Sequence, residues 1–164
     1  MIDAQTRALA ARVLDACRAR RWTLATAESC TGGLVAGALT EIAGSSDVVD
    51  RGYVTYSDAA KMELLGVPEA TLAKFGAVSR QTAEAMAGGA LERSGVDLAV
   101  SVTGIAGPGG GSATKPVGLV HFAAVVRGSP ARDERKMLYG DVGRSEIRRL
   151  SVLEALDMLL KLAA

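Results

Sequence analysis

The stretch from Val96 to Val102 (VDLAVSV) most limits what this chain can fold into. It is an almost continuous apolar run, which is typical of a strand covered on both faces rather than one with a wet side. Such a strand needs helices above and below the sheet that contains it. We therefore predict a three-layer α/β/α domain with a mixed central sheet of four to five strands, formed by residues 1–164 as a single domain.

The remaining segments alternate between helix-like and strand-like patterns, as a layered α/β domain requires. Gly44, Gly66, Gly76 and Gly95 are well placed to end helices. The spacing of apolar residues predicts helices over about 4–20, 34–42, 58–65, 68–75, 80–94 and 144–163. Rows of β-branched and aromatic residues predict strands over about 22–27, 48–56, 96–102, 117–126 and 136–139, the last partly at an edge because of its charges.

The charge balance argues against a protein that coats nucleic acid. The chain has 19 Lys and Arg against 18 Asp and Glu, a formal net charge of +1, so no basic surplus is present to neutralise a row of phosphates. A single small anionic ligand remains compatible with this balance.

The chain shows no feature of a secreted or membrane protein. Two cysteines, Cys17 and Cys30, cannot build a disulfide framework and fit a reducing compartment. The N-terminus reads as an amphipathic helix rather than a signal peptide, and no run approaches the roughly 20 apolar residues needed to cross a bilayer. We expect a cytoplasmic protein that has no membrane partner.

Glu28-Ser29-Cys30-Thr31-Gly32-Gly33 is the first segment with chemical potential. Ser29 is expected just before a helix, where unpaired backbone N–H groups can stabilise an oxyanion beside a nucleophile. The glycines would let the backbone approach a ligand closely. On local pattern alone, Ser29 can equally be a helix N-cap in a tight turn. The pattern is not the G-x-S-x-G elbow of the α/β-hydrolases.

A serine nucleophile needs a base, and Lys61 is better placed than the one histidine. His121 lies within the apolar stretch 117–126, where a packed strand residue is expected. Lys61 falls in the first turn of a helix, where the N–H groups disfavour a cation, and Ser-Lys pairs are a known variant of the triad. Tyr56 can orient or polarise Lys61, although taken singly both residues also fit ordinary structural roles.

The third segment is the glycine-rich loop over 103–116 (TGIAGPGGGSATKP). Consecutive N–H groups in such turns form anion nests, and Ser112 and Lys115 can add a hydroxyl and a charge. A loop of this length inside a compact domain is usually functional or disordered. Because no Gly-Lys-Ser/Thr follows, it is not a P-loop.

No metal site or cofactor is expected, since one histidine and two distant cysteines offer no ligand spacing. Asp47, Asp50 and Asp58 could form only a weak oxygen site. Cys30 is a competing nucleophile, because a helix N-terminus lowers the pKa of a thiol. With no histidine beside it, Cys30 ranks below Ser29.

Four ordered motifs together carry a family resemblance. TAESCTGG (26–33), YSDAAKMELLGV (56–67), SVTGIAGPGGGS (101–112) and KPVGLV (115–120) resemble the CinA C-terminal domain, a family that includes nicotinamide-nucleotide amidases. The resemblance extends from about residue 5 to 160. It implies a three-layer α/β fold and a homodimer or another homo-oligomer.

The resemblance also implies an activity, namely hydrolysis of nicotinamide mononucleotide (NMN) to nicotinate mononucleotide and ammonia without a cofactor. Matched by motif, Ser29 is the catalytic serine, Lys61 its general base, and Tyr56 and Thr103 assist them. The residues matched to substrate binding are Cys30, Thr31, Gly32, Gly33, Gly104, Gly109, Gly110, Gly111, Ser112, Arg144 and Arg148.

Two positions depart from the family pattern. Asp58 stands where the family usually has asparagine, and a carboxylate touching substrate would repel its phosphate. The family's Gly-Asp-Arg segment has two residues inserted here, Gly140-Asp141-Val142-Gly143-Arg144. Arg144 and Arg148 keep a one-turn spacing, so either can bind the phosphate. Relatives also carry an N-terminal partner domain, whose activity we expect to be absent here.

Three other functions compete with this hypothesis. The same loops can hold a nucleotide without reaction, as a binding or regulatory module. The amidase can act on a different amide. A DNA-linked role, suggested only by the competence-related family name, is disfavoured by the near-zero charge and the 4% aromatic content.

Overall fold

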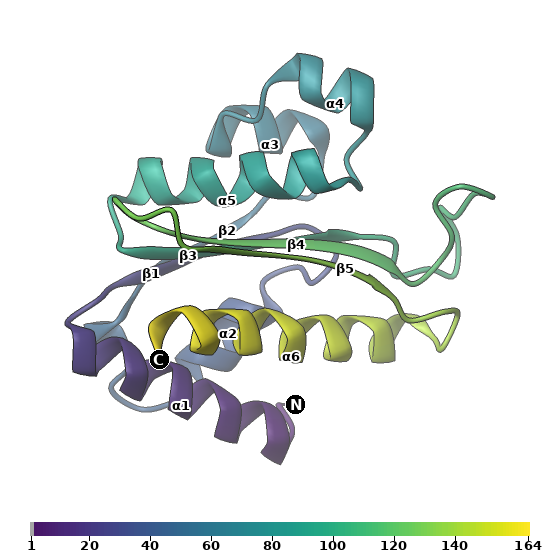
Figure 1. Cartoon of the computed structure of the whole chain (residues 1–164). Coiled ribbons are helices and arrows are strands. Elements are labelled where there is room, and N and C mark those ends of the chain that lie inside the picture. The colour runs from purple at the N-terminus through teal and green to yellow at the C-terminus, as the bar shows by residue number, and fades with distance from the viewer. Residues whose placement is uncertain (1) are drawn as a thin grey trace.

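The computed structural model describes residues 2–164 and consists of three layers. Helices α3, α4 and α5 cover one face of the sheet, and α1, α2 and α6 cover the other (Figure 1). The predicted α/β/α architecture with a mixed sheet is confirmed.

The helices and strands follow the predicted order, with small shifts at their ends. The helices are α1 Ala4–Arg20, α2 Leu34–Thr40, α3 Asp58–Leu65, α4 Glu69–Phe75, α5 Arg80–Ser94 and α6 Arg144–Ala163, with a 3₁₀ turn at Ser45–Asp47. The strands are β1 Leu24–Glu28, β2 Val49–Val54, β3 Leu98–Gly104, β4 Leu119–Val126 and β5 Arg132–Leu138.

Sheet topology brings the ends of three strands together. The strand order is β2-β1-β3-β4-β5, with β1 parallel to both β2 and β3, and with β4 antiparallel to β3 and β5. Glu28, the last residue of β1, is in register with Val54 on one side and Val102 on the other. The segments that follow these strands therefore lie at one edge of the sheet, the usual location of ligand sites in α/β proteins.

The central strands are buried on both faces, as the apolar run at 96–102 predicts. Side chains alternate along a strand. Leu24, Val100 and Val102 accordingly pack with the layer of α1, α2 and α6. Ala25 and Ala99 face the opposite layer. Two apolar cores, one on each side of the sheet, thus hold this edge of the sheet in place.

Helix α3 can lie close to α5 because Gly89 of α5 has no side chain. A Cβ atom at this position would lie 1.9 Å from the carbonyl oxygen of Leu65, at the end of α3. No other residue type permits this approach without moving a backbone. Gly89 therefore sets the depth at which α3 lies on α5.

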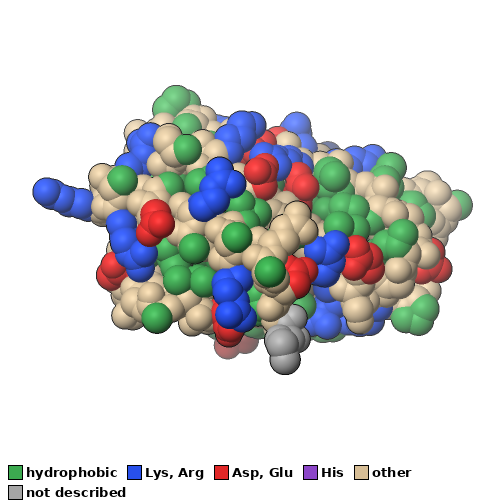
Figure 2. Space-filling model, turned by 90° about the horizontal axis from the view of Figure 1, so that it is seen from below, with side chains coloured by type: hydrophobic (Ala, Val, Ile, Leu, Met, Phe, Trp, Pro, Cys, Tyr) green, Lys and Arg blue, Asp and Glu red, His purple; other side chains and the backbone are tan. Residues whose placement is uncertain are grey.

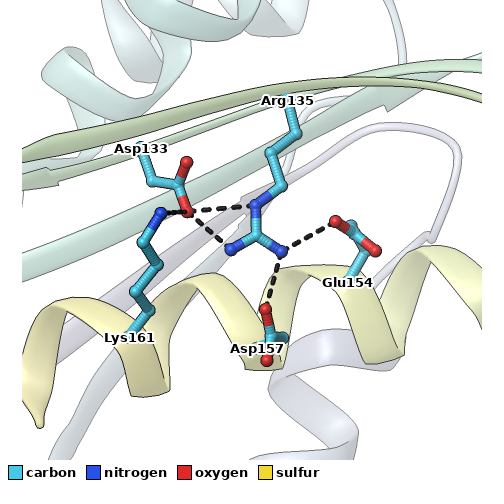
Figure 3. Close-up of polar contacts among 5 residues, drawn as sticks. All are labelled: Asp133, Arg135, Glu154, Asp157 and Lys161. Carbon is cyan, nitrogen blue, oxygen red and sulfur yellow. Dashed lines mark hydrogen bonds and ion pairs between the residues drawn. The ribbon is translucent and has the colours of Figure 1, made fainter.

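Strand β5 begins earlier than predicted, at Arg132 rather than about 136. Two of its charged residues, Asp133 and Arg135, are paired with residues of α6 (Figure 3). Arg135 donates to Asp133, Glu154 and Asp157, and Lys161 reaches Asp133. The carboxylates hold the pKa of Arg135 above its usual range. Long-range pairing of this kind leaves no periodic signal in the strand itself.

The face formed by α1, α2 and α6 mixes charges of both signs with apolar side chains (Figure 2). Arg7 pairs with Glu41, and Arg149 with Asp3 and Glu146. Within residues 2–164, no helix is both long and apolar enough to cross a membrane.

Candidate active site

Ser29 follows β1 directly and begins a tight turn. Its backbone N–H donates to the carbonyl of Val102 on β3 at 2.9 Å, which extends the pairing of the two strands by one residue. Its own carbonyl accepts from Gly32 N–H at 3.1 Å. Ser29 is nearly buried, with an exposed fraction of 8%.

The first turn of α2 is capped by Glu28, a residue to which sequence reasoning assigned no role. Its buried carboxylate accepts from the N–H groups of Gly33, Val35 and Ala36 at 2.9–3.1 Å. The prediction that the helix start offers unpaired N–H groups is therefore wrong for α2 itself. A carboxylate at a helix start is favoured by the macrodipole, and a Glu five residues before the N-cap Gly33 was the available signal.

Lys61 reaches Ser29 from a different layer of the molecule. It belongs to the first turn of α3, and its amine lies 3.0 Å from the Ser29 hydroxyl. The same Nζ donates to the backbone carbonyls of Thr55 at 2.8 Å and Tyr56 at 3.3 Å. Sequence-distant serine and lysine are thus within proton-transfer distance.

Burial lowers the pKa of Lys61 below its usual 10.5, because the side chain is only 1% exposed and the charged form loses hydration. Asp58 and Cys30 act in the opposite direction and raise it. With two N–H bonds to carbonyls, a neutral amine has its lone pair left for the Ser29 proton.

The two side chains open into a cavity of about 220 Å³. Its lining combines the β1, β2 and β3 ends with the segment before α5 and one arginine from α6. The lining residues are Ser29, Cys30, Tyr56, Lys61, Ala77, Val78, Thr103, Gly104, Ala106 and Arg144.

Thr103 and Tyr56 both line this cavity, but in different ways. Thr103 is fully buried, and its hydroxyl donates to the carbonyl of Ala77 at 2.7 Å, which leaves oxygen lone pairs to accept. Tyr56 is 62% exposed, and its phenol accepts from Arg144 at 3.1 Å. Tyr56 contacts Lys61 through its backbone carbonyl, whereas its phenol accepts a hydrogen bond from Arg144.

Cys30 lines the cavity but is a poor nucleophile. Burial raises the pKa of its thiol to about 12, with the Glu28 carboxylate adding to the rise. The expected lowering by a helix start is outweighed, because Glu28 neutralises that end of α2 and the thiol is desolvated.

The glycines after Ser29 accommodate the protein's own side chains. A Cβ at Gly32 would lie 3.3 Å from the Arg148 guanidinium, and one at Gly33 would lie 3.3 Å from Val54. Neither glycine lines the cavity. Thr31 is buried, and its hydroxyl has no partner among residues 2–164.

Most of the glycine-rich loop lies away from the serine. Gly104 and Ala106 line the cavity, whereas residues 109–112 are exposed and do not. In Figure 1 the segment between β3 and β4 projects beyond the layers. Lys115 is tied to the carbonyl of Phe75 at 2.6 Å, at the end of α4.

Of the three arginines of α6, Arg144 lines the 220 Å³ cavity and Arg148 contacts the Ser29 turn. Arg144 donates to the carbonyl of Gly107 at 2.8 Å and lines both this cavity and a neighbouring one of about 660 Å³. Arg148 donates to the carbonyls of Cys30 and Thr31, each at 3.2 Å. Asp58 is exposed and does not line the cavity. Within the described residues, no three His, Cys, Asp or Glu side chains are grouped to hold a metal ion.

Comparison with known sequences places these features in context. The family model described as the CinA C-terminal domain matches residues 6–163. A protein of Enterobacter agglomerans named nicotinamide-nucleotide amidohydrolase PncC is 47% identical, over 98% of this chain and 97% of its own length. The Escherichia coli protein of the same name is also 47% identical, over 97% of this chain and 95% of its own.

Other relatives are longer. A CinA-like protein of Akkermansia muciniphila is 54% identical over 83% of this chain, which corresponds to 32% of that protein. The chain therefore spans about a third of the length of such relatives and nearly all of the length of the PncC proteins.

Solved structures agree in fold. The competence/damage inducible protein CihA of Agrobacterium tumefaciens superposes with a TM-score of 0.97 at 56% identity, over 100% of this chain and 99% of that one. A competence damage-inducible protein A of Klebsiella pneumoniae has a TM-score of 0.89 at 40% identity, over 95% of each chain.

Proposed function

The chain belongs to the CinA C-terminal domain family, and we propose that it is an amidohydrolase that acts on nicotinamide nucleotides. The proposed substrate is NMN, and the products are nicotinate mononucleotide and ammonia. Support comes from two relatives with the amidohydrolase name that align over almost their entire lengths.

One observation carries the proposal, namely the 3.0 Å separation of Lys61 Nζ and Ser29 Oγ at the floor of a cavity. Fully burying a lysine is costly and is seldom done for stability alone. In a cleft, an amine whose pKa is lowered is a typical general base for a neighbouring hydroxyl that acts as the nucleophile.

In the proposed reaction, the neutral Lys61 amine takes the proton of Ser29 as the oxygen attacks the carboxamide carbon. The C–N bond then breaks, and ammonia leaves with the proton returned by Lys61, directly or through Thr103. Water, deprotonated by Lys61, hydrolyses the acyl-enzyme and frees Ser29. The positive pyridinium ring already activates the carboxamide, which suits a modest base.

The oxyanion formed at the carboxamide oxygen needs donors near Ser29. The turn and α2 use the N–H groups of Ser29, Gly32, Gly33 and Val35. The N–H groups of Cys30 and Thr31 are not used in these contacts. We assign the oxyanion site to that pair, of which Cys30 lines the cavity and Thr31 follows it in the turn.

The cavity's size fits part of a nucleotide. Its volume of about 220 Å³ lies below the roughly 300–1,000 Å³ of pockets that enclose drug-sized ligands, so the pyridine carboxamide would enter and the ribose phosphate would stay outside. Arg144 at the mouth would then bind the phosphate, because guanidinium groups suit phosphate oxygens. Thr103, with free lone pairs, would accept from the carboxamide nitrogen.

An ammonia-release assay on the purified protein tests the proposal. NMN, nicotinamide riboside and nicotinamide are compared side by side, with a chelator present to test independence from metals. We expect release from NMN that Ser29→Ala abolishes while the melting temperature is kept. Wild-type turnover by Ser29→Ala would overturn the assignment of the nucleophile.

The main alternative is a nucleotide-binding or regulatory module of the same fold. Tight NMN binding without ammonia release would establish it. A different amide substrate would instead show as ammonia release from nicotinamide riboside or nicotinamide without release from NMN.

We further propose that the protein works as a homodimer or another homo-oligomer in the cytoplasm. Cys17 and Cys30 are both free and buried, in keeping with a reducing compartment. Light scattering of the purified protein measures the oligomer size, and a monomer at assay concentration would refute the first part.

A further inference from the structure

Arg148 contacts the turn after Ser29 and does not line the 220 Å³ cavity, although with Arg144 it lines the larger cavity of about 660 Å³. From the second turn of α6, its Nε donates to the Cys30 carbonyl and its Nη2 to the Thr31 carbonyl, each at 3.2 Å. The guanidinium thus spans two consecutive peptide groups directly after Ser29. Cys30 is itself 5% exposed, so this contact lies under the floor of the site.

A hydrogen bond that fixes a backbone carbonyl also fixes the direction of the N–H of the next residue. The carbonyl of Cys30 and the N–H of Thr31 belong to one planar trans peptide, in which the two groups point in opposite directions. Arg148 draws the Cys30 oxygen toward α6 and thereby turns the Thr31 N–H away from α6. The Ser29 carbonyl, held by Gly32 N–H at 3.1 Å, orients the Cys30 N–H in the same manner.

Gly32 makes room for this arrangement. Its φ is +59°, a left-handed conformation that side chains rarely adopt, and an added Cβ would lie 3.3 Å from Nη2 of Arg148. On the other end of the turn, Glu28 accepts from Gly33 N–H at 3.1 Å. The turn after Ser29 is therefore held from both ends: the Arg148 guanidinium binds its carbonyl groups, and the Glu28 carboxylate accepts from the N–H of Gly33.

We propose that Arg148 is a positioning residue that orients the Thr31 N–H of the oxyanion site through the Cys30 carbonyl and does not bind the substrate's phosphate. This inference rests on the proposed function. It gives different roles to Arg144 and Arg148, which the sequence alone made equal candidates for binding the phosphate. Arg144 faces the mouth of the cavity, whereas Arg148 acts through the backbone of Cys30 and Thr31.

Steady-state kinetics of Arg148→Met and Arg148→Lys test the assignment. Oxyanion contacts form only in the transition state, so kcat should fall while KM stays within about twofold. Loss of one oxyanion donor costs about 10²–10³ in kcat, and a misaligned donor should cost about 10- to 100-fold. Arg148→Lys should recover little, because an ammonium cannot span both carbonyls.

Arg149→Met is the matched control. It removes the neighbouring α6 guanidinium, which pairs with Asp3 and Glu146 instead of with the turn. We expect kcat and KM to stay within about twofold of the wild-type values. Melting temperatures of all three variants are recorded, and if Arg148→Met does not fold, Arg148→Lys decides.

The phosphate-binding alternative makes the opposite prediction. It requires a raised KM for NMN with kcat kept, and no effect of Arg148→Met on nicotinamide riboside, which has no phosphate. That result would overturn the inference. A kcat loss of equal size on both substrates supports it.

A substrate-independent readout separates this inference from the proposed function. A fluorophosphonate phosphonylates serine nucleophiles: the serine oxygen bonds to phosphorus, fluoride leaves and the base Lys61 takes the serine proton, while the P=O oxygen occupies the oxyanion site. Labelling of Ser29, measured by mass spectrometry, should slow about 10- to 100-fold in the Arg148 variants. If no amide is hydrolysed yet labelling slows, only the proposed substrate fails, whereas an unchanged labelling rate refutes the role of Arg148.

Discussion

Replacing Lys61 by methionine should remove turnover and leave the protein about as stable as before. The side chain is 1% exposed, and its amine sits among backbone carbonyls and one hydroxyl rather than in water. Methionine has a similar length and no charge to desolvate. The substitution therefore tests whether this lysine is retained for chemistry or for structure.

The magnitudes follow from the contacts that change. Loss of a general base costs about 10²–10⁴ in rate, which is about 2.7–5.4 kcal/mol at ~1.36 kcal/mol per tenfold. The carbonyls of Thr55 and Tyr56 lose their Lys61 donor, at about 1 kcal/mol each. Burying a thioether instead of an amine returns a similar amount. The net change in unfolding free energy should stay within about 2 kcal/mol, or roughly 4–8 °C in melting temperature for a chain of this size.

The pH dependence has a definite sign. Because burial lowers the pKa of Lys61 below 10.5, the unfolded chain binds more protons than the folded one between the lowered pKa and 10.5. Wild-type stability therefore rises with pH across this window and falls as the pH decreases. Lys61→Met has no such dependence, so its stability relative to wild type should increase as the pH is lowered.

Urea unfolding at several pH values and ammonia release from NMN measure both effects. A Lys61→Met protein that keeps more than a tenth of wild-type kcat would refute the role of Lys61 as the base. A folded variant whose stability relative to wild type does not change with pH would refute the lowered pKa of Lys61.

Three further outcomes are expected. Asp58→Asn should move the rising limb of the pH–rate profile to lower pH, because the Asp58 carboxylate raises the pKa of Lys61; a shift to higher pH would contradict this. Cys30→Ala should keep kcat within about threefold, and wild-type Cys30 should resist iodoacetamide at pH 8, since burial raises its thiol pKa to about 12; rapid alkylation would show otherwise. Arg135→Met should lower the free energy of unfolding by about 1–3 kcal/mol, less than for a fully buried pair because Asp157 is 57% exposed, and an unchanged urea midpoint would show that the network adds nothing.

Local sequence was a good guide to the elements and to the layers. The apolar run at 96–102 identified a strand buried on both faces, and β3 is such a strand. Gly66 and Gly95 end α3 and α5 in the left-handed conformation, as predicted, whereas α2 ends at Thr40, before Gly44. The start of β5 was missed, because Arg135 is paired with α6 residues about 20 positions away and Glu134 with Arg80 of α5.

Some residues of the site could be identified from the sequence, and the roles of others could not. Ser29 and Lys61 stood out through their residue types and family motifs, yet 32 residues separate them in the chain. They meet because β2 pairs parallel to β1, which returns the chain to the edge where β1 ends. The roles of Glu28 and Arg148 had no local signal strong enough to show which backbone groups they bind.

The sequence by itself determined the order of elements and the two-sided burial of the centre, and it supplied the residue types that we propose for acyl transfer, because these depend on side-chain type and on periodicity along the chain. Only the tertiary structure decided which N–H groups stay free, that Arg148 turns toward a backbone loop, and that the Lys61 amine loses its water. Those properties arise from groups brought together across strands and layers, and a hydrogen bond or a desolvated charge depends on neighbours in space, not on neighbours in the chain.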